Sequence, residues 1–483
     1  MQFNFVVTLT FLVYFITLLI IGIYSYFHTR NLSDYILGNR NISSVVAALS
    51  AEASDMSGWL LLGLPGYAYL AGFEAGWIAL GLLIGTYLNW LLVAPKLRTH
   101  PAAIGESLTL ADYFEKRFND SSRILRIITA FFILTFFTFY TSSGFVAGGK
   151  LFNSVFNIPY FYAVLIGAVS ILFYTYLGGF LAVCWTDCFQ GILIFFALLL
   201  VPSITTQING GWIETTNIIK SVNSFLLNPF RTSDNETITV IAIASLMGWG
   251  LGYFGQPHIL ARFMAIRSEK QIPIARRIAI VWVFLTLSGA LIVGIAGIAS
   301  FPNLLQGAES EKIFIKLVEE ILHPIPAGIC LAAILAAIMS TADSQLLVSS
   351  AAFAEDFYKP FIRKNATQKE LVLVGRLAVF TITIIAFILA LNPESKILDL
   401  VAYAWAGFGA SFGPTILFSL YCKKMTRNAA LIGIITGGLT VIVWKQLKDG
   451  IFNLYEIVPA FLLSSLAIIL ITVLENKFRK QNL

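Results

Sequence analysis

Two apolar stretches of this sequence are interrupted near their midpoints by glycine, proline and polar residues. The first break reads ASDMSGW (53–59), and the second reads MGWGLGYFGQP (247–257). Hydrocarbon offers no hydrogen bonds to a backbone, so a break at membrane depth persists only where it lines a cavity inside the protein. Paired breaks in corresponding helices are typical of the substrate site of a secondary transporter. The sequence therefore predicts an ion-coupled symporter.

The first break combines an ionisable side chain with a flexible turn. Asp55 lies near the middle of a span, where a charge costs at least about 2.5–3.5 kcal/mol and marks an ion path or a partner. Its alternative role is a scaffold, capping the half-helix that restarts after the break. Gly58 tolerates unusual backbone angles and lets a ligand approach. Carbonyls freed at Ala53 and Met56 are hard oxygen ligands for Na⁺, and the N–H groups after Ser57 suit a carboxylate.

A third segment, LAAILAAIMSTADS (331–344), complements the first break. Its small residues recur at helical spacing and permit close approach of a neighbouring helix. At that contact the Ala337 carbonyl and the hydroxyls of Ser340 and Thr341 can surround a small cation. Hydroxyls in a helix commonly bond back to their own carbonyls. The prediction of a Na⁺ site therefore depends on pairing this segment with the first break.

The second break carries aromatic residues among its glycines. Glycine at this density, followed by Pro257, argues against an unbroken helix. Trp249 and Tyr253 are four residues apart and are expected to wall a small pocket. The alternative, a glycine-mediated packing face, fits Phe254 best. Tyr140 is a further pocket candidate.

The bulk composition places the whole chain in a bilayer. Of 483 residues, 58% are hydrophobic and 12% are charged, whereas soluble domains carry roughly 25% charged residues. We expect an all-α integral membrane protein, one transmembrane domain over 1–483. Apolar runs long enough to cross about 30 Å of hydrocarbon predict thirteen spans, at 6–27, 43–70, 76–94, 124–152, 161–181, 185–201, 238–263, 275–301, 325–354, 371–391, 397–421, 429–444 and 457–474.

The distribution of basic residues predicts the orientation. With the N-terminus outside and thirteen crossings, 24 of the 32 basic residues fall on the inner side, as the positive-inside rule requires. The net charge of +6 then reflects orientation rather than nucleic-acid binding, because the basic residues are spread over separate loops. The inner set consists of Arg30, Arg40, Lys96, Arg98, Lys116, Arg117, Arg123, Arg126, Arg262, Arg267, Lys270, Arg276, Arg277, Lys359, Arg363, Lys364, Lys369, Arg376, Lys423, Lys424, Arg427, Lys477, Arg479 and Lys480.

Three connecting segments have a distinct character. The segments 107–118, inside, and 310–322, outside, are expected to be interfacial amphipathic helices rather than gates. Residues 207–237 form the longest polar external loop. Only nine residues follow 474, so no soluble domain is expected there.

The motifs of the three segments resemble one family of membrane proteins. AEASDMSGWL (51–60), GLGYFGQPHI (250–259) and MSTADSQLL (339–347) are similar to the sodium:solute symporter family, and most to its sodium/proline branch. The resemblance extends from the first span to the last.

This resemblance implies a fold, an ion site and a substrate site. The fold is the five-plus-five inverted repeat of LeuT-like transporters, with spans two to six (about 43–201) and seven to eleven (about 238–421) as the repeats. The implied Na⁺ ligands and substrate contacts can be named in this chain. Na⁺ would be held by Ala53, Met56, Ala337, Ser340 and Thr341, and the substrate by Ser57, Gly58, Trp59, Tyr140, Trp249, Tyr253 and Pro257.

Two further implications concern ions. Asp187 corresponds to an acidic residue associated with the inward Na⁺ path. Some relatives have a second Na⁺ site built on two hydroxyls, but here those positions read Asp343 and Ser344, so the match is incomplete.

The predicted function is uptake of L-proline driven by inward flow of Na⁺, by alternating access in a bacterial-type plasma membrane, with the C-terminus cytoplasmic. Another amino acid, pantothenate or a sugar acid remains an alternative substrate. A transporter-like sensor and a channel are the alternatives of another class. No G-x-x-x-x-G-K-[ST] motif is present, so a pump or enzyme driven by nucleotide is not expected.

Overall fold

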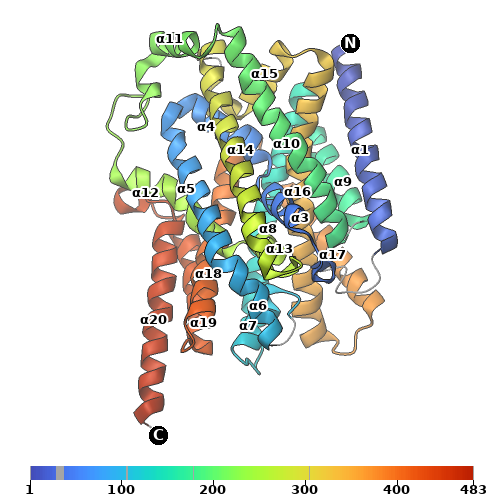
Figure 1. The fold of residues 1–483 in the computed structure, drawn as a ribbon, viewed down its shortest axis with the longest axis vertical. Helices are drawn as coiled ribbons and strands as arrows, with labels where there is room; N and C mark the ends of the chain where they lie inside the picture. The colour runs from blue at the N-terminus through green and yellow to red at the C-terminus, as the bar shows by residue number, and fades with distance from the viewer. Residues whose placement is uncertain (1, 29–36, 105–106, 178, 304, 482–483) are drawn as a thin grey trace.

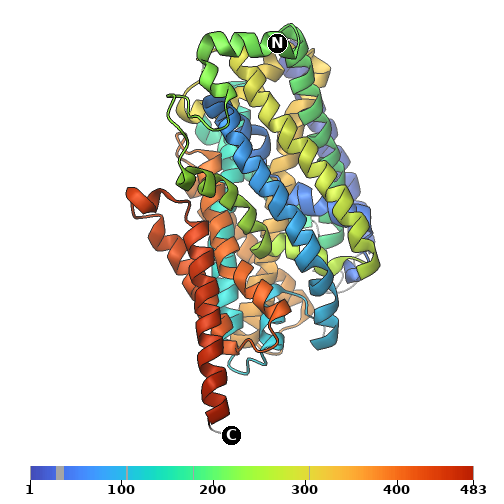
Figure 2. The same cartoon turned by 60° about the vertical axis from the view of Figure 1, so that its left-hand side comes forward.

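Residues 2–28, 37–104, 107–177, 179–303 and 305–481 are described by a computed structural model, in which long helices run between two ends of the molecule (Figure 1). The start of α1 lies at the same end as α11 and α15, which we call the α15 end. The α7 helix and the C-terminus lie at the opposite end, the α7 end, in both views (Figures 1 and 2). This arrangement agrees with an odd number of crossings.

The described residues are helical apart from turns and two isolated β-bridges. The α-helices are α1 (Gln2–His28), α3 (Ser44–Asp55), α4 (Leu64–Ala71), α5 (Gly76–Leu88), α6 (Ala94–Ile104), α7 (Leu110–Arg117), α8 (Ile124–Phe156), α9 (Tyr160–Leu177), α10 (Phe180–Ile208), α11 (Trp212–Asn223), α12 (Val240–Gly248), α13 (Pro257–Ala265), α14 (Ile272–Ser300), α15 (Ile313–Ile321), α16 (Pro324–Ala351), α17 (Gln368–Leu389), α18 (Ile397–Tyr421), α19 (Arg427–Trp444) and α20 (Ile457–Gln481). The shorter 3₁₀ and π segments are η1 (Gly38–Arg40), η2 (Trp59–Gly63), η3 (Gly72–Ala75), η4 (Asn89–Val93), η5 (Ser224–Leu227), η6 (Trp249–Gly255), η7 (Glu269–Gln271), η8 (Gly307–Lys312), η9 (Ala352–Ile362) and η10 (Gly450–Asn453).

The helices are long and apolar enough for a membrane protein. Among the described residues, 10 helical stretches meet the length and hydropathy of a membrane span, and Tyr160–Leu172 and Val240–Gly255 are shorter apolar helices. The expected span 397–421 coincides with α18, whereas α10 extends beyond its expected span of 185–201 at both ends. The count of thirteen spans stays a prediction.

Both expected breaks are present. The helix α3 ends at Asp55, and the π-helix η2 begins at Trp59. The helix α12 is followed by the 3₁₀ segment η6, and α13 then begins with Pro257. Proline suits the first position of a helix because its missing N–H would have no partner there.

The connecting segments contain short helices. The expected inner segment 107–118 contains α7, whose N-cap Thr109 accepts a hydrogen bond from the Asp112 N–H at 3.0 Å. The expected outer segment 310–322 contains the end of η8 and then α15. The polar segment 207–237 contains an additional helix, α11, which the sequence analysis left as loop.

Two basic residues lie inside the bundle rather than in loops. Arg262 was counted in the inner set, but it is not a loop residue, because its side chain is 0% exposed within α13. The side of the membrane on which it lies stays a prediction. Lys150 is 2% exposed within α8. Both have acidic partners inside the bundle, described below, which is why burial of these charges is tolerated. Arg30 of the inner set lies outside the described residues.

The two halves of the molecule approach closely where α5 crosses η6. A Cβ added to Gly85 would lie 2.2 Å from the carbonyl oxygen of Gly250, and one added to Gly81 would lie 2.4 Å from that of Met247. Only glycine fits at this crossing. It brings the second break against the helix that follows the first.

Candidate functional site

The first break changes the partners of two backbone N–H groups. In a regular α-helix the Ser57 N–H would donate to the Ala53 carbonyl, and the Leu60 N–H to the Met56 carbonyl. Here Ser57 donates to the Asp55 carbonyl at 2.9 Å, and Leu60 donates to the Ser57 carbonyl at 3.0 Å. The Ala53 and Met56 carbonyls therefore lose the helical bonds that would otherwise occupy them. These are the two carbonyls that the sequence analysis assigned to Na⁺.

The predicted partner helix meets this break directly. The Ser340 hydroxyl of α16 lies 2.8 Å from the Ala53 carbonyl oxygen and 3.2 Å from that of Ala337. The Thr341 hydroxyl lies 3.1 Å from the same Ala337 oxygen. Four of the five predicted Na⁺ ligands thus form one connected set of oxygens, and all of their residues are buried. Hard oxygens on two helices in this arrangement suit a small cation such as Na⁺.

Asp55 connects the first break to the second. Its carboxylate accepts a hydrogen bond from the Tyr253 hydroxyl of η6 at 2.7 Å. Its backbone carbonyl accepts bonds from the Tyr140 hydroxyl at 3.0 Å and from the Trp59 indole at 3.3 Å. Of the two interpretations offered for Asp55, the geometry favours a scaffold, although the scaffold reaches across to η6 instead of capping the restarted helix.

Aromatic rings from both breaks lie together. The rings of Trp59 and Trp249 are 6.1 Å apart, and the Trp249 ring lies 5.5 Å from that of Tyr455. Trp249 and Tyr253, four residues apart, were expected on one face, around a small pocket. They stand on the 3₁₀ segment η6, where residues three apart align. Phe254 packs against Phe461 at 6.3 Å between ring centres, in agreement with its packing interpretation.

Side chains outside the predicted set hold the second break. The Trp405 indole of α18 donates to the Trp249 carbonyl at 2.7 Å. The Gln256 amide donates to the Gly252 carbonyl at 3.1 Å and to that of Trp405 at 3.3 Å. These bonds replace part of the helical pairing that η6 lacks. A tryptophan in an apolar span carries an N–H group that needs an acceptor, so the sequence could have pointed to Trp405. The sequence does not show that its acceptor lies on η6.

Position 58 needs a residue without a side chain because of close packing and not because of its backbone angles. Its φ and ψ are −52° and −19°, which are ordinary right-handed helical values. A Cβ at this position would lie 2.7 Å from the Ala147 Cβ of α8 and 3.2 Å from Ile338 of α16. The expectation of unusual angles is therefore wrong. The residue is small because two helices close on the restart of η2.

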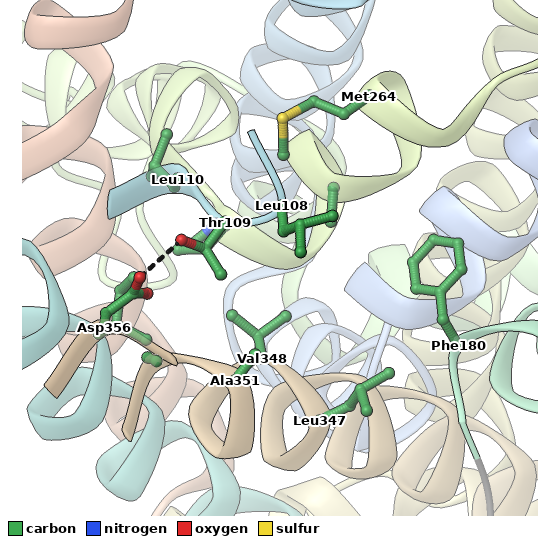
Figure 3. Close-up of a pocket in the computed structure, with 13 residues that line it drawn as sticks. Leu108, Thr109, Leu110, Phe180, Met264, Leu347, Val348, Ala351 and Asp356 are labelled. Carbon is green, nitrogen blue, oxygen red and sulfur yellow. Dashed lines mark hydrogen bonds between the residues drawn. The ribbon is translucent and has the colours of Figure 1, made fainter. Parts of the chain in front are cut away.

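Pro257 lines a cavity to which Thr109 and Leu110, at the start of α7, also contribute. The cavity has a volume of about 30 Å³, enough for a water molecule or two and too small for an amino acid. Figure 3 shows Leu347, Val348 and Ala351 on one side and Met264 and Phe180 on others. The Thr109 hydroxyl donates to Asp356 across the far side of the cavity at 2.9 Å (Figure 3).

Arg126 joins three carboxylates near this cavity. Its guanidinium lies 3.1 Å from the Asp356 carboxylate, 2.6 Å from that of Asp112 and 3.1 Å from that of Glu115. These contacts tie α7 to α8 and to η9. The short segment expected to cover the bundle end therefore also closes the cavity beside Asp356.

A second buried ion pair links α8 to η8, the segment that precedes α15. The Lys150 ammonium of α8 lies 2.5 Å from the Glu311 carboxylate of η8. Glu311 also accepts the backbone N–H groups of Ile397 and Leu398 at 3.0 and 3.1 Å, at the first turn of α18. A carboxylate is favourable at a helix N-terminus. The lone charge of Lys150 in an apolar run was visible in the sequence, but its pairing with Glu311 across 161 residues was not.

Asp187 is held by a network that the sequence analysis missed. Its carboxylate accepts the Ser50 hydroxyl at 2.6 Å and pairs with Arg262 at 3.0 Å. Arg262 also donates to the Ser344 hydroxyl at 2.5 Å. Ser344 is one of the two positions that correspond to hydroxyl ligands of a second Na⁺ site in some relatives. Here its hydroxyl accepts a hydrogen bond from the Arg262 guanidinium. The neighbouring Asp343 carboxylate is buried with no partner for either oxygen among the described residues.

Known proteins with similar sequences are symporters. The model of the sodium:solute symporter family matches residues 35–437. The sodium/proline symporter of Escherichia coli (strain K12) is 51% identical over 470 residues, which cover 96% of this chain and 92% of that protein. The high-affinity proline transporter PutP of Bacillus subtilis (strain 168) is 48% identical over 458 residues, covering 95% of this chain and 96% of that protein.

Solved structures agree with the fold. A Na⁺-coupled sialic acid symporter in a substrate-bound, outward-open state is similar with a TM-score of 0.80 over 98% of both chains, at 19% identity. Mhp1, a nucleobase-cation-symport-1 family transporter, is similar with a TM-score of 0.55 over 91% of this chain and 95% of that one, at 14% identity. These likenesses show the fold alone, and they confirm the expected LeuT-like, all-α membrane architecture.

Proposed function

The chain belongs to the sodium:solute symporter family, and we propose that it couples the inward flow of Na⁺ to the uptake of L-proline across the plasma membrane. The relatives that are 46–51% identical over most of the chain are named as proline symporters or transporters. These relatives transport solutes rather than convert them, so the chain is assigned to transport and not to an enzymatic reaction.

One observation supports the proposal most strongly. The Ala53 carbonyl, which has lost its helical partner, lies against the Ser340 hydroxyl of α16. The rings of Trp59 and Trp249, one from each break, lie 6.1 Å apart, and the Trp59 indole donates to the carbonyl of Asp55 in the same break. In the proposed mechanism Na⁺ binds to the carbonyls of Ala53, Met56 and Ala337 and the hydroxyls of Ser340 and Thr341. Na⁺ then holds α3 against α16 and fixes the geometry of the break.

Proline would bind at the other side of the same break. A carboxylate is suited to the N–H groups at the start of a restarted helix, here those following Ser57. The pyrrolidine ring offers an apolar face, and the rings of Trp59, Trp249 and Tyr253 offer apolar walls with hydrogen-bonding edges. Tyr140 steadies the break through the Asp55 carbonyl. Gly58 lets α8 pack against it, and Pro257 starts the helix that leads toward the α7 end.

The shared break makes the two ligands cooperative. If Na⁺ orders the break that proline also uses, each ligand raises the affinity of the other by the same factor. A membrane potential of 100 mV adds about 2.3 kcal/mol for each positive charge that enters. Inward Na⁺ flow therefore suffices to concentrate a neutral zwitterion.

We propose the same orientation and repeats that the sequence indicated. The N-terminus and the α15 end lie outside, and the α7 end and the C-terminus lie in the cytoplasm. Residues 43–201 and 238–421 form the two inverted repeats. In alternating access the pair Lys150–Glu311 opens and closes the outer side, Arg126 with Asp356 opens and closes the inner side, and Asp187 lies beside the inward path of Na⁺.

Uptake by purified protein in proteoliposomes tests this function. Labelled L-proline should accumulate when Na⁺ is high outside and should not accumulate when K⁺ replaces Na⁺. Excess unlabelled L-proline should abolish the signal. Excess pantothenate, a sugar acid or another amino acid should leave most of it.

The opposite outcomes are informative. Stronger competition by one of the other solutes would assign that solute as the substrate while keeping the Na⁺ site. Proline flux that ignores the Na⁺ gradient would contradict symport. Na⁺ flux without any solute would indicate a channel.

A further inference from the structure

A cavity between α18 and α20 has no role in the proposed function. It has a volume of about 630 Å³, and its wall is formed by the last turn of α18, the turn that follows it and the final part of α20. None of the residues that line it belongs to either break. The cavity is therefore a feature separate from the proposed ion and substrate sites.

The two helices that form this cavity run in the same direction. The Tyr455 hydroxyl, just before α20, donates to the Ala402 carbonyl near the start of α18 at 2.6 Å. The Asn476 amide, near the end of α20, donates to the Lys424 carbonyl just after α18 at 3.0 Å. The cavity therefore lies where both helices finish, and α20 finishes at the α7 end of the molecule (Figures 1 and 2).

Along both helices the wall of the cavity changes from apolar to basic toward the α7 end. Its apolar part consists of Phe418, Ile469 and Val473, and its basic part of Lys424, Lys477 and Arg479. Ile469 and Val473 are 44% and 60% exposed, so the apolar part is open to the surface of the bundle. From Ile469 to Lys477 the helix rises about 12 Å, more than the roughly 6 Å headgroup layer of one leaflet. The wall thus reaches from the headgroup layer into hydrocarbon.

The basic part of the cavity has no acidic counterpart. Among the described residues, no acid lines the cavity, and no ion pair includes one of its three bases. Glu475 is the acid nearest to them in sequence, and its carboxylate accepts the Asn428 amide at 2.7 Å. The three positive charges can therefore take a counter-charge only from outside the described protein.

Another cavity, beside Arg126, is built differently. It has a volume of about 360 Å³ and is lined by acids as well as bases. Lys116 pairs with Asp112 at 2.9 Å, and Lys359 pairs with Glu355 at 2.8 Å. That cavity contains its own counter-ions, whereas the cavity between α18 and α20 presents positive charge alone.

A polar group without a partner lies between the apolar and basic parts. Thr472 lines the cavity and is 8% exposed, and its hydroxyl oxygen is buried with no partner among the described residues. A phospholipid carries its ester oxygens between its chains and its phosphate, so it presents acceptors at the level of this hydroxyl. The order of groups along α20 therefore matches the order of groups along a phospholipid.

We propose that this cavity binds an anionic phospholipid, with the phosphate at the basic part and the acyl chains along the apolar part. A soluble anion would use the bases and leave the apolar wall unused. Basic pockets between membrane helices suit anionic lipid headgroups. In the orientation proposed above the lipid belongs to the inner leaflet, but its binding does not depend on which solute is transported.

Native mass spectrometry of the delipidated, full-length protein in detergent tests the proposal. Phosphatidylglycerol, which is anionic, or phosphatidylcholine, which is zwitterionic, is titrated in with the same acyl chains, and bound lipids are counted. Wild type should bind its first phosphatidylglycerol at least about tenfold more tightly than its first phosphatidylcholine. Equal affinity for the two lipids would overturn the proposal.

Two triple variants separate a built site from general charge attraction. Removal of the basic part should abolish most of the preference for phosphatidylglycerol, in the variant Lys424→Gln, Lys477→Gln and Arg479→Gln. The control removes two lysines and one arginine that are exposed and lie outside the cavity, in the variant Lys270→Gln, Arg277→Gln and Lys369→Gln. The control should keep the preference. Equal loss in the two variants would show general attraction and would overturn the site.

A second pair of variants tests the apolar part without changing charge. Val473→Trp fills the cavity and should weaken the first phosphatidylglycerol at least about fivefold. Leu470→Trp is the matched control, because Leu470 is also 60% exposed on α20 but does not line the cavity. Equal affinities of these two variants would contradict a role for the apolar wall.

Two competing occupants give different results in the same experiment. Excess inorganic phosphate should leave phosphatidylglycerol bound, and its displacement by phosphate would reduce the site to a soluble-anion site and overturn the proposal. A dimer of the chain that disappears in Val473→Trp, with no phosphatidylglycerol bound to wild type, would assign the cavity to a second copy and would also overturn it.

Discussion

The two breaks of the membrane helices are built in different ways. Between α3 and η2 only Met56 to Gly58 separate the two helical segments, and the bonds that shift leave the Ala53 carbonyl oxygen facing Ser340 of α16. Between α12 and α13 the chain keeps a tight 3₁₀ turn throughout η6, and its carbonyls at Trp249 and Gly252 are taken by Trp405 and Gln256. The first break offers oxygen to a ligand, whereas the second satisfies its own oxygens and offers aromatic rings.

In the proposed function, this difference lets the two neighbouring breaks serve an ion and a zwitterion. A cation needs several free oxygens close together, which a short break against a small-residue helix supplies. An amino acid needs apolar walls with few polar groups, which a rigid aromatic turn supplies. The hydrogen bond from the Tyr253 hydroxyl to the Asp55 carboxylate joins the two breaks. We therefore expect a shift of one break to move the other.

The largest effect is expected from an added methyl group at the first break. In Gly58→Ala the new Cβ would lie 2.7 Å from the Ala147 Cβ, so α8 or η2 must move. We expect Na⁺-driven proline uptake to fall at least about tenfold, equivalent to 1.4 kcal/mol. Gly63→Ala is the matched control, because its Cβ would meet Leu398 at an ordinary 3.4 Å. Equal uptake by the two variants would show that the close packing of Gly58 is unimportant.

A smaller and more specific effect is expected on the ion side. Ser340→Ala or Thr341→Ala removes one oxygen ligand, so the Na⁺ concentration for half-maximal uptake should rise about tenfold. Ser349→Ala removes a buried hydroxyl from the same helix that has no partner among the described residues, and it should leave Na⁺ activation unchanged. Unaltered Na⁺ activation curves in both site variants would remove these hydroxyls from the site.

The smallest effect of the series is expected at the aromatic turn. Trp249→Ala should raise the half-saturation constant for proline about fivefold, consistent with loss of an aromatic contact, and should change that of Na⁺ less. Phe254→Ala, whose ring packs against Phe461, should change the proline constant by less than twofold, or about 0.4 kcal/mol. Parallel increases in both variants would indicate general loosening of η6 instead of a substrate wall.

The sequence predicted the features that depend on local composition. Glycine, proline and polar residues at 53–59 and 247–257 predicted both breaks, and small residues at 331–344 predicted which helix packs on the first one. The contact of Ser340 with Ala53, across 287 residues, was expected only after the segment was paired with the first break. Local rules sufficed for the breaks themselves, because each break is set by residues within two helical turns.

The features that were missed depend on pairing across long stretches of chain. Arg262 looked like a loop residue because its partner Asp187 is 75 residues away. The role of Gly58 was assigned to its torsion angles because the approach of α8 cannot be read from the sequence. The cavity between α18 and α20 was missed for the same reason, since Lys424 and Lys477 line one cavity only when the two helices are placed together.

The most direct test of the account is proline binding to the purified protein in saturating Na⁺ and in K⁺ at the same ionic strength. The account requires the first break to serve both ligands, so wild type should bind proline several-fold more tightly in Na⁺, equivalent to about 1 kcal/mol of coupling or more. Gly58→Val, which crowds the same break, should lose most of that ratio. Equal proline affinity of the wild-type protein in the two salts would contradict the coupling that the structure is proposed to provide.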